Sequence, residues 1–312
     1  MAAHAQRAVR VSRWAGAAIL SAGLALAMTA PAATASVAAP RSAAAATAAT
    51  RAAAAGPRGV QAKAAAIAVA ATGRVLWSRD LNTERPMASI TKVMTALVVI
   101  RAGRLSRKIT VPSAALSYVD TYDASSAGLW AGDTLTATQL LAALLLPSGA
   151  DAAYTLAEAY GPGLTAFIAK MNATARLLGM TRTHFANFDG LPWPTEYSTY
   201  STPASLIKLG RAAMSSAVFR SVVGQRSWRI TASREHHAYF WHSLNPLLGV
   251  YRGAIGIKTG FTLAAGHCLL FEATRGGQSF IGVNLDSPGV GTTVNGDDAT
   301  RMLNWAFSLH SQ

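Results

Sequence analysis

A serine and a lysine stand one helical turn apart in the run Ser89-Ile90-Thr91-Lys92. If Ser89 opens a helix, residues i and i+3 share a face, so the Lys92 amine can lie beside the Ser89 hydroxyl. A serine becomes a nucleophile when such a base takes its proton. Because an ordinary lysine is protonated at neutral pH, burial and a neighbouring positive charge would have to lower the pKa of Lys92. The spacing therefore indicates nucleophilic catalysis by a serine–lysine pair.

The spacing alone is a weak signal, because the run Ser205-Leu206-Ile207-Lys208 repeats it later in the chain. This second match lies inside a predicted amphipathic helix, where ordinary surface and core positions explain both residues. The pair at the first match needs further residues of matching chemistry before it predicts an active site.

A second candidate motif, Lys258-Thr259-Gly260, ends a predicted strand. Lys258 and Thr259 offer a cation and a hydroxyl to a carboxylate, and Gly260 would let a substrate lie close against the strand edge. Lys258 would also supply the positive field that keeps Lys92 neutral. Taken in isolation, the tripeptide is explained better by a strand end with a turn glycine.

A third motif, Ser148-Gly149-Ala150, falls in a break between two predicted helices. A hydroxyl at Ser148 can relay a proton from the base to a leaving amine. In isolation this motif also has a simpler explanation, a loop serine beside a turn glycine.

The elements that must position these residues follow from the spacing of apolar residues and from the turn residues. Strands are predicted near both ends of the chain and helices in the middle, which indicates an α+β domain whose sheet takes strands from both ends. The predicted strands are 64–71, 74–78, 228–231, 254–258, 267–273 and 279–284. The predicted helices are 89–100, 134–146, 151–160, 164–178, 205–214 and 298–310.

Taken together, the three motifs resemble the set found in β-lactamases and penicillin-binding proteins. The longer stretches around them are similar to those of the serine D-Ala-D-Ala carboxypeptidases, the low-molecular-mass penicillin-binding proteins. The resemblance covers roughly residues 60–312. The stretches that carry it are Met87-Ala88-Ser89-Ile90-Thr91-Lys92-Val93-Met94-Thr95-Ala96-Leu97, Leu145-Leu146-Pro147-Ser148-Gly149, Leu178-Gly179-Met180-Thr181, Asn187-Phe188-Asp189-Gly190-Leu191, Gly256-Ile257-Lys258-Thr259-Gly260-Phe261-Thr262 and Ala265-Gly266-His267-Cys268.

The resemblance implies that Ser89 is acylated by the penultimate D-Ala carbonyl of a peptidoglycan stem peptide, which releases D-Ala. It assigns Lys92 as the base and Ser148 as the proton shuttle. Lys258 and Thr259 would hold the terminal carboxylate of the substrate.

The resemblance also implies a β-lactamase/transpeptidase-like fold, with an antiparallel sheet, flanking helices and a helical subdomain. Gly260 belongs to the expected substrate-binding strand. The backbone N–H groups of Ser89 and Phe261 would form an oxyanion hole, in which one donor contributes about 3 kcal/mol. Water would give carboxypeptidase action and an acceptor amine would give cross-linking, while β-lactams would acylate Ser89 as substrate mimics. No cofactor is implied.

Two departures from the family pattern stand out. Ala150 occupies a position that is usually Asn, so one hydrogen bond to the substrate backbone is missing. The loop 286–298 also lacks the Arg that some relatives offer to the substrate carboxylate. Two alternatives therefore stay open. One is a class A β-lactamase, with Glu158 or Glu196 activating the deacylating water, and the other is a catalytically weak protein that binds penicillin or the cell wall.

The N-terminal region differs in composition from the rest of the chain. Residues 1–35 combine a basic start, a short apolar stretch and a small-x-small exit, which predicts a secretory signal peptide. Residues 36–58 are Ala-rich and low in complexity, so we expect a linker before a catalytic domain over 59–312. We accordingly expect an exported, extracytoplasmic protein with peripheral association to the cell envelope.

The overall composition excludes several classes of protein. With 51% hydrophobic residues in 312 the chain can bury a core, and one cysteine cannot form an internal disulfide. The net charge of +14 is scattered, and the aromatic residues do not alternate with Arg or Lys, which argues against nucleic-acid binding. The histidines at 236, 237 and 242 show no familiar metal-ligand spacing, so no metal is expected.

Overall fold

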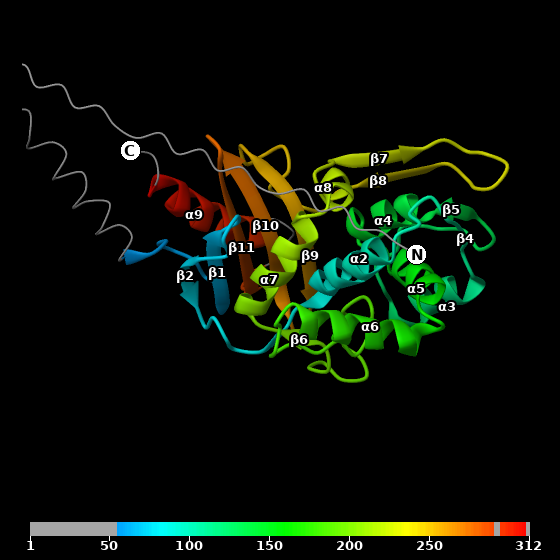
Figure 1. Ribbon diagram of the computed structural model, residues 1–312, viewed down its shortest axis with the longest axis horizontal. Helices are drawn as coiled ribbons and strands as arrows, with labels where there is room; N and C mark the ends of the chain where they lie inside the picture. The colour runs from blue at the N-terminus through cyan, green and yellow to red at the C-terminus, as the bar shows by residue number, and fades with distance from the viewer. Residues whose placement is uncertain (1–54, 290–293, 310–312) are drawn as a thin grey trace, which may run out of the picture. The chain divides into compact units, whose positions relative to one another are not determined.

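A five-stranded antiparallel sheet joins the two ends of the folded region, with strand order β2-β1-β11-β10-β9 (Figure 1). Residues Ala64 to Val69 of β1 pair with Leu285 to Phe280 of β11, so an early strand lies beside a late one. This pairing confirms the predicted sheet built from both chain ends. The strands are β1 (Ala64–Val69), β2 (Val75–Arg79), β9 (Ala254–Thr262), β10 (Gly266–Arg275) and β11 (Gln278–Ser287).

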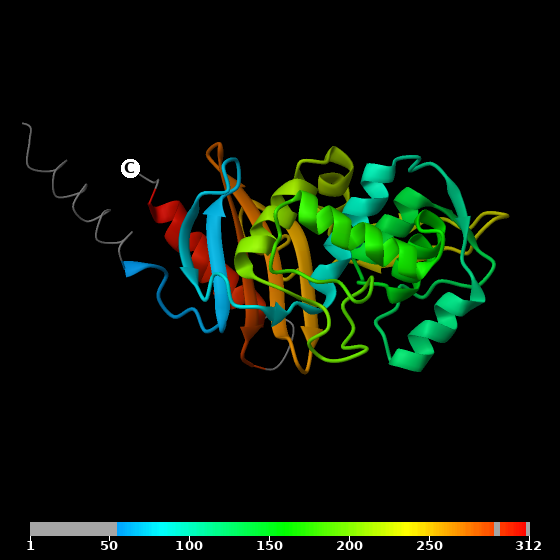
Figure 2. The same cartoon turned by 60° about the horizontal axis from the view of Figure 1, so that its bottom comes forward.

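Helices cover both faces of this sheet, as the two views show (Figures 1 and 2). Helix α9 (Val294–Ser308) packs on β10 and β11, and α7 (Pro203–Met214) packs on β1 and β11. Alternate residues of β1 belong to different cores: Ala64 and Ala66 lie in the α7 core, whereas Ala65 and Ile67 lie in the α9 core. Burial on both faces explains why β1 has no polar positions.

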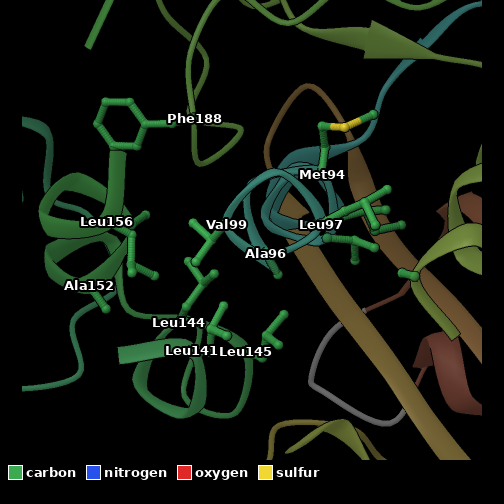
Figure 3. Packing of buried hydrophobic residues seen from close by; sticks show 14 of the residues in the cluster. Met94, Ala96, Leu97, Val99, Leu141, Leu144, Leu145, Ala152, Leu156 and Phe188 are labelled. Carbon is green, nitrogen blue, oxygen red and sulfur yellow. The ribbon is translucent and has the colours of Figure 1, made fainter. Parts of the chain in front are cut away.

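Helix α2 (Thr91–Ala102) forms the centre of the helical subdomain and follows a single 3-10 turn, η1 (Ala88–Ile90). Nine of its twelve residues are buried, including the polar Thr91, Lys92 and Thr95, so the helix is enclosed on nearly every side. Figure 3 shows Met94, Ala96, Leu97 and Val99 of α2 among the side chains that surround them. The surrounding helices are α4 (Ala137–Leu145), α5 (Ala150–Tyr160), α6 (Leu164–Leu177), α7 and α8 (Ala217–Val223).

The helical subdomain differs from the sequence predictions in several places. Residues predicted as the start of a helix at 134 form a short strand, β5 (Thr134–Thr136), which pairs with β4 (Lys108–Thr110). The helix begins only after Thr136, whose hydroxyl and Gln139 make a capping box. Helix α3 (Ser113–Tyr122) and helix α8 were not predicted. The predicted strand 228–231 exists as β7 (Ser227–Ile230), but its partner β8 (Tyr239–His242) was missed.

This computed structural model describes residues 55–289 and 294–309. The predicted signal peptide, and the linker up to residue 54, lie outside the described residues. Within the described part, no helix combines the length and apolar character needed to cross a bilayer. A further two-stranded sheet pairs β3 (Arg85–Pro86) with β6 (Tyr200–Ser201), and it ties the segment before η1 to the chain after α6.

Candidate active site

Ser89 and Lys92 meet at the start of α2, as the spacing predicted. The Lys92 Nζ donates a hydrogen bond to the Ser89 Oγ at 3.0 Å and another to the backbone carbonyl of Asp189 at 3.3 Å. Lys92 is 1% exposed, whereas Ser89 is only partly buried. The Lys92 amine is therefore sheltered from water while the Ser89 hydroxyl can be reached from outside, an arrangement that suits a serine nucleophile and its base.

The backbone around Ser89 is held by the loop that contains Asn187 and Gly190. The Gly190 N–H donates to the Asn187 Oδ1 at 2.7 Å, and the Asn187 amide donates in turn to the carbonyl of Leu191 at 2.8 Å. A Cβ on Gly190 would lie 1.9 Å from the carbonyl oxygen of Ala88, so the two backbones are in direct contact. Ala88 itself has a φ of +47°, a left-handed conformation that costs a non-glycine residue about 1 kcal/mol or more.

Strand β9 brings Lys258, Thr259 and Gly260 to the same place. A Cβ on Gly260 would lie 2.9 Å from the Met87 carbonyl oxygen and 3.0 Å from the Ser89 nitrogen. We expected Gly260 to let a substrate lie close to the strand, and the close approach of the Ser89 backbone is a second reason for a glycine here. Because β9 is the last strand of the sheet, one of its edges is not paired with a strand and faces η1.

The ammonium group of Lys258 is as deeply buried as that of Lys92. Lys258 is 1% exposed, and its Nζ donates to the Thr259 carbonyl at 3.0 Å. Thr259 is partly buried and Phe261 is 54% exposed, so the last part of β9 presents a hydroxyl and then an aromatic ring to the outside. The structure thus places Lys258 beside the serine–lysine pair, at the edge where a substrate could lie along β9.

Both lysines have a pKa below the usual value for lysine, for related reasons. Burial is the main cause in each case, and for Lys258 the charge of Lys92 lowers the pKa further. The carboxylates of Asp189 and Asp151 act in the opposite direction on Lys92 and raise its pKa. The two ammonium groups repel each other, so a proton on one lysine disfavours a proton on the other. Because both acids act on Lys92, they favour Lys92 as the protonated lysine in the unliganded site.

Ser148 lies in the turn between α4 and α5, as predicted, with 4% of its surface exposed. Its φ is +67°, which is unusual for a residue other than glycine and is found at functional sites. In the part of the chain that the structure describes, no hydrogen bond joins the Ser148 Oγ to Ser89 or Lys92. Ala150, which replaces the usual Asn, is fully buried at the first residue of α5.

Asp151 organises the loop that passes behind Ser148. Its buried carboxylate accepts hydrogen bonds from the N–H groups of Ala127 and Leu129 at 3.0 and 3.1 Å, and from the Ser126 hydroxyl at 2.7 Å. The Ser125 hydroxyl donates to the Ser148 carbonyl at 2.6 Å. The predicted helix 151–160 begins at this residue, and in the structure Asp151 holds both the helix start and this loop.

Asp189 is a buried acid of the site to which the sequence analysis gave no role. Its carboxylate accepts a hydrogen bond from the Tyr118 hydroxyl at 3.0 Å and one from the Leu191 N–H at 3.2 Å. The Trp193 indole N–H donates to that same Tyr118 oxygen at 3.1 Å. Burial raises the pKa of Asp189, while the charge of Lys92 lowers it. The only signal in the sequence was its place inside the stretch 187–191, which carried part of the family resemblance.

The other sequence candidates lie apart from this chemistry. In the second serine–lysine match, Ser205 is buried and Lys208 is exposed, with its amine donating to the Gly179 carbonyl at 2.6 Å. Cys268 is buried, and burial raises the pKa of its thiol to about 12, which suits an inert packing residue. Glu158 and Glu196 are both exposed, and neither bonds to Ser89 or Lys92 within the described residues.

Metal chemistry gains no support from the described residues, which contain no group of three or more His, Cys, Asp or Glu side chains arranged to hold a metal ion. Of the three clustered histidines, His237 bonds to the Asp133 carboxylate through its Nδ1 at 2.9 Å and stacks on the exposed Trp130.

Comparisons with known proteins agree with this geometry. The family model for D-alanyl-D-alanine carboxypeptidase matches residues 48–289. A D-alanyl-D-alanine carboxypeptidase of Streptomyces sp. strain K15 is 40% identical over 250 residues, which are 76% of this chain and 84% of that protein. A second relative with this name, from Mycobacterium tuberculosis, is 36% identical over 79% of this chain and 82% of its own length.

Solved structures show the same relationship. The crystal structure of the Streptomyces K15 DD-transpeptidase superposes with a TM-score of 0.75 at 38% identity, covering 80% of this chain and 98% of that one. The D-alanyl-D-alanine carboxypeptidase of Mycobacterium tuberculosis gives a TM-score of 0.73 at 33% identity, covering 82% and 97%. The predicted transpeptidase-like α+β fold is thereby confirmed. The chain belongs to the D-alanyl-D-alanine carboxypeptidase family, the serine DD-peptidases.

Proposed function

We propose that Ser89 is the nucleophile and Lys92 the base in cleavage of the terminal D-Ala from a peptidoglycan stem peptide. The observation that carries this assignment is the 3.0 Å hydrogen bond from a fully buried lysine to a reachable serine hydroxyl. The Ser89 oxygen attacks the carbonyl carbon of the penultimate D-Ala while its proton passes to the Lys92 amine. The peptide C–N bond then breaks, and the departing D-Ala nitrogen takes up a proton relayed through Ser148. Water afterwards hydrolyses the ester on Ser89 and completes the carboxypeptidase reaction.

Lys258 and Thr259 would hold the terminal carboxylate of the substrate. Among the described residues, no acid forms an ion pair with Lys258, and the two acids near the site act on Lys92. A substrate carboxylate beside Lys258 would therefore favour the charged form of that lysine. The repulsion between the two ammonium groups would then disfavour a proton on Lys92, which gives the neutral base that acylation needs. Binding of the substrate carboxylate would thus lower the pKa of Lys92 and favour its neutral form.

The developing oxyanion would be stabilised by backbone N–H groups of Ser89 and Phe261. The close approach of Gly260 to the Ser89 nitrogen supports this assignment, because it sets the start of α2 directly against β9. One such donor contributes about 3 kcal/mol to transition-state stabilisation.

The polymer that carries the substrate lies outside the cytoplasm, and we propose that the chain is exported to reach it. Support comes from the basic, apolar and small-residue pattern of 1–35 and from the Ala-rich segment 36–58. Without the three arginines of 1–35 the net charge is 14 − 3 = +11, which favours peripheral association with an anionic envelope.

A pair of matched variants tests the assignment. Fluorescent penicillin should label the wild type stably, Ser89→Ala should abolish the label, and Ser205→Ala in the second serine–lysine match should retain it. Incubation with diacetyl-Lys-D-Ala-D-Ala, with and without an added amine, should release D-Ala and show how hydrolysis and transfer divide. Rapid turnover of the label would instead indicate a β-lactamase. Absence of both label and hydrolysis would indicate a protein that only binds the wall, and a labelled Ser89→Ala variant would contradict the nucleophile.

A further inference from the structure

The hairpin of β7 and β8 supplies no residue to the proposed reaction, yet it is bonded to the segment beside Ser148. The hairpin extends from α8 along the helical subdomain towards β5 (Figure 1), and the Glu235 carbonyl near its tip accepts the Thr134 N–H at 2.8 Å. Buried and exposed residues alternate along β8, and Tyr239 and Trp241 form its buried face, with ring centroids 5.2 Å apart. Two aromatic side chains that each carry a polar group therefore point from β8 into the protein.

Both polar groups bond to residues 124–130, a segment without helix or strand. The Trp241 indole N–H donates to the Ala127 carbonyl at 2.7 Å, and the Tyr239 hydroxyl accepts the Trp130 N–H at 3.2 Å. Trp241 and Ala127 are both buried. Because buried backbone groups need hydrogen-bond partners and this segment makes no regular ladder, side chains have to supply them. Strand β8 thus fixes the segment at two points.

The same segment holds the turn that carries Ser148. The Ser125 hydroxyl donates to the Ser148 carbonyl at 2.6 Å, and the Ser125 carbonyl accepts the Ala150 N–H at 2.7 Å. A Cβ on Gly149 would lie 2.7 Å from the Ala127 Cβ, so the segment is in direct contact with the turn. Ser148 has a φ of +67°, and such a backbone conformation persists only where the surroundings impose it. The position of the Ser148 hydroxyl therefore depends on residues 124–130.

Ala127 joins the contacts on the two sides of the segment. Its carbonyl accepts the Trp241 indole N–H, its own N–H donates to the Asp151 carboxylate at 3.0 Å, and its methyl group lies against Gly149. If the indole N–H is removed, the buried carbonyl loses its donor, which favours a shift of Ala127 towards another partner. A shift of about 1 Å at a catalytic group can cost on the order of 100-fold in rate.

We propose that Trp241 is a positioning residue for Ser148. Its indole N–H, supported by the Tyr239 hydroxyl, fixes Ala127 and through it the turn from which the Ser148 hydroxyl reaches the departing nitrogen. The inference rests on the proposed function, in which Ser148 relays a proton to that nitrogen. It adds the β7–β8 hairpin to the parts of the protein that this proton transfer requires.

Two substrates that differ only in the departing atom separate this role from a merely structural one. Diacetyl-Lys-D-Ala-D-Ala releases an amine, so its C–N bond breaks only as the nitrogen gains a proton. In the thioester analogue a sulfur atom replaces that nitrogen. The thiolate leaves with the electron pair of the C–S bond and needs no relayed proton, since the pKa of a thiol is about 8.5. Both substrates leave the same ester on Ser89, and kcat/KM reports the steps up to that ester.

Trp241→Phe keeps an aromatic ring and removes the N–H. We expect its kcat/KM for the peptide to fall by about tenfold and its kcat/KM for the thioester to stay within about twofold of the wild type. Ser148→Ala should show the same split with a larger loss on the peptide. Trp228→Phe is the matched control, because Trp228 lies opposite Trp241 in the β7–β8 ladder and its indole donates no hydrogen bond to another described residue. This control should keep the wild-type kcat/KM for both substrates.

All variants are assayed below their unfolding midpoints in urea, and Tyr239→Phe, which keeps its ring and loses its hydroxyl, replaces Trp241→Phe in the comparison if the latter does not fold. Equal losses on both substrates, or no loss, would overturn the positioning role of Trp241 and leave the proposed function standing. A split in Trp228→Phe as large as that in Trp241→Phe would overturn the assignment to the indole hydrogen bond. Equal losses in Ser148→Ala would overturn the proposed proton relay and this inference with it.

Discussion

Replacement of Gly190 by alanine is a direct test of how Ser89, the proposed nucleophile, is positioned. Gly190 has a φ of +89°, and a Cβ there would lie 1.9 Å from the Ala88 carbonyl oxygen, 2.4 Å from the Ala88 carbonyl carbon and 2.7 Å from the Thr91 hydroxyl. Real Cβ atoms essentially never come closer than 3.0 Å to another heavy atom. The backbone that carries Ser89 must therefore move by about 1 Å or more, since most of the obstructing atoms are backbone atoms.

The expected effect on catalysis is large, because a displacement of about 1 Å at a reacting group can cost on the order of 100-fold in rate. Gly132 supplies a matched control. It has the same φ of +89°, but a Cβ on it would meet nothing within 4 Å. Gly132→Ala should therefore lose only the left-handed backbone term, about 1–2 kcal/mol of unfolding free energy. Gly190→Ala should lose that amount plus about 1–3 kcal/mol for the overlap.

The assay is the second-order rate constant for acylation by fluorescent penicillin, measured well below the unfolding midpoints of both variants in urea. We expect Gly190→Ala to acylate about 100-fold more slowly than Gly132→Ala. If the two variants acylate within threefold of each other while both are folded, the contact between Gly190 and Ala88 does not position Ser89, and the argument from close packing is wrong.

Three further predictions concern Asp189, Asp151 and Ser148. Asp189→Asn should move the acidic limb of the kcat/KM profile to lower pH, because the Asp189 carboxylate raises the pKa of Lys92 and its loss lets the neutral base persist at lower pH; an unmoved limb would contradict the coupling. Asp151→Ala should lower the unfolding free energy by about 3 kcal/mol, measured in urea, since buried N–H groups lose their acceptor, and a loss below about 1 kcal/mol would show that the loop has other support. Ser148→Ala should slow acylation by about 100-fold, and an unchanged rate would mean that Lys92 protonates the leaving amine without a relay.

The parts of the site that depend on residues close together in the sequence could be predicted. Ser89 and Lys92 are three residues apart on a helix, and β9 was recognised from its apolar run, so local spacing was enough. The first strand and its pairing with late strands followed from the distribution of apolar residues along the chain. Each of these inferences used a period of 2 or 3.6 residues, which the backbone imposes on any sequence.

The parts of the site that depend on contacts between residues far apart in the sequence could not be predicted. Asp189 acts on Lys92 across 97 positions, and its partner Tyr118 lies 71 positions away on a helix that the pattern did not show. The strong apolar run after Thr136 predicts helix from residue 134 onward, and only pairing with Lys108–Thr110 reveals the strand at Thr134–Thr136. No local pattern carries this information, because propensity yields to tertiary packing.

The arrangement of charge in the site explains why two acids without obvious catalytic roles accompany two buried lysines. An ammonium group removed from water is costly unless a counter-charge or hydrogen bonds replace the solvent. Asp189 and Asp151 lie near enough to raise the pKa of Lys92, yet among the described residues neither forms an ion pair with it. They therefore stabilise the charged form of Lys92 without a direct contact that would prevent its amine from losing a proton. Lys258 has no such acid, so in the free protein its charge remains incompletely compensated. Under the proposed function, the substrate carboxylate would supply the missing partner, and the binding energy gained there would shift the proton away from Lys92.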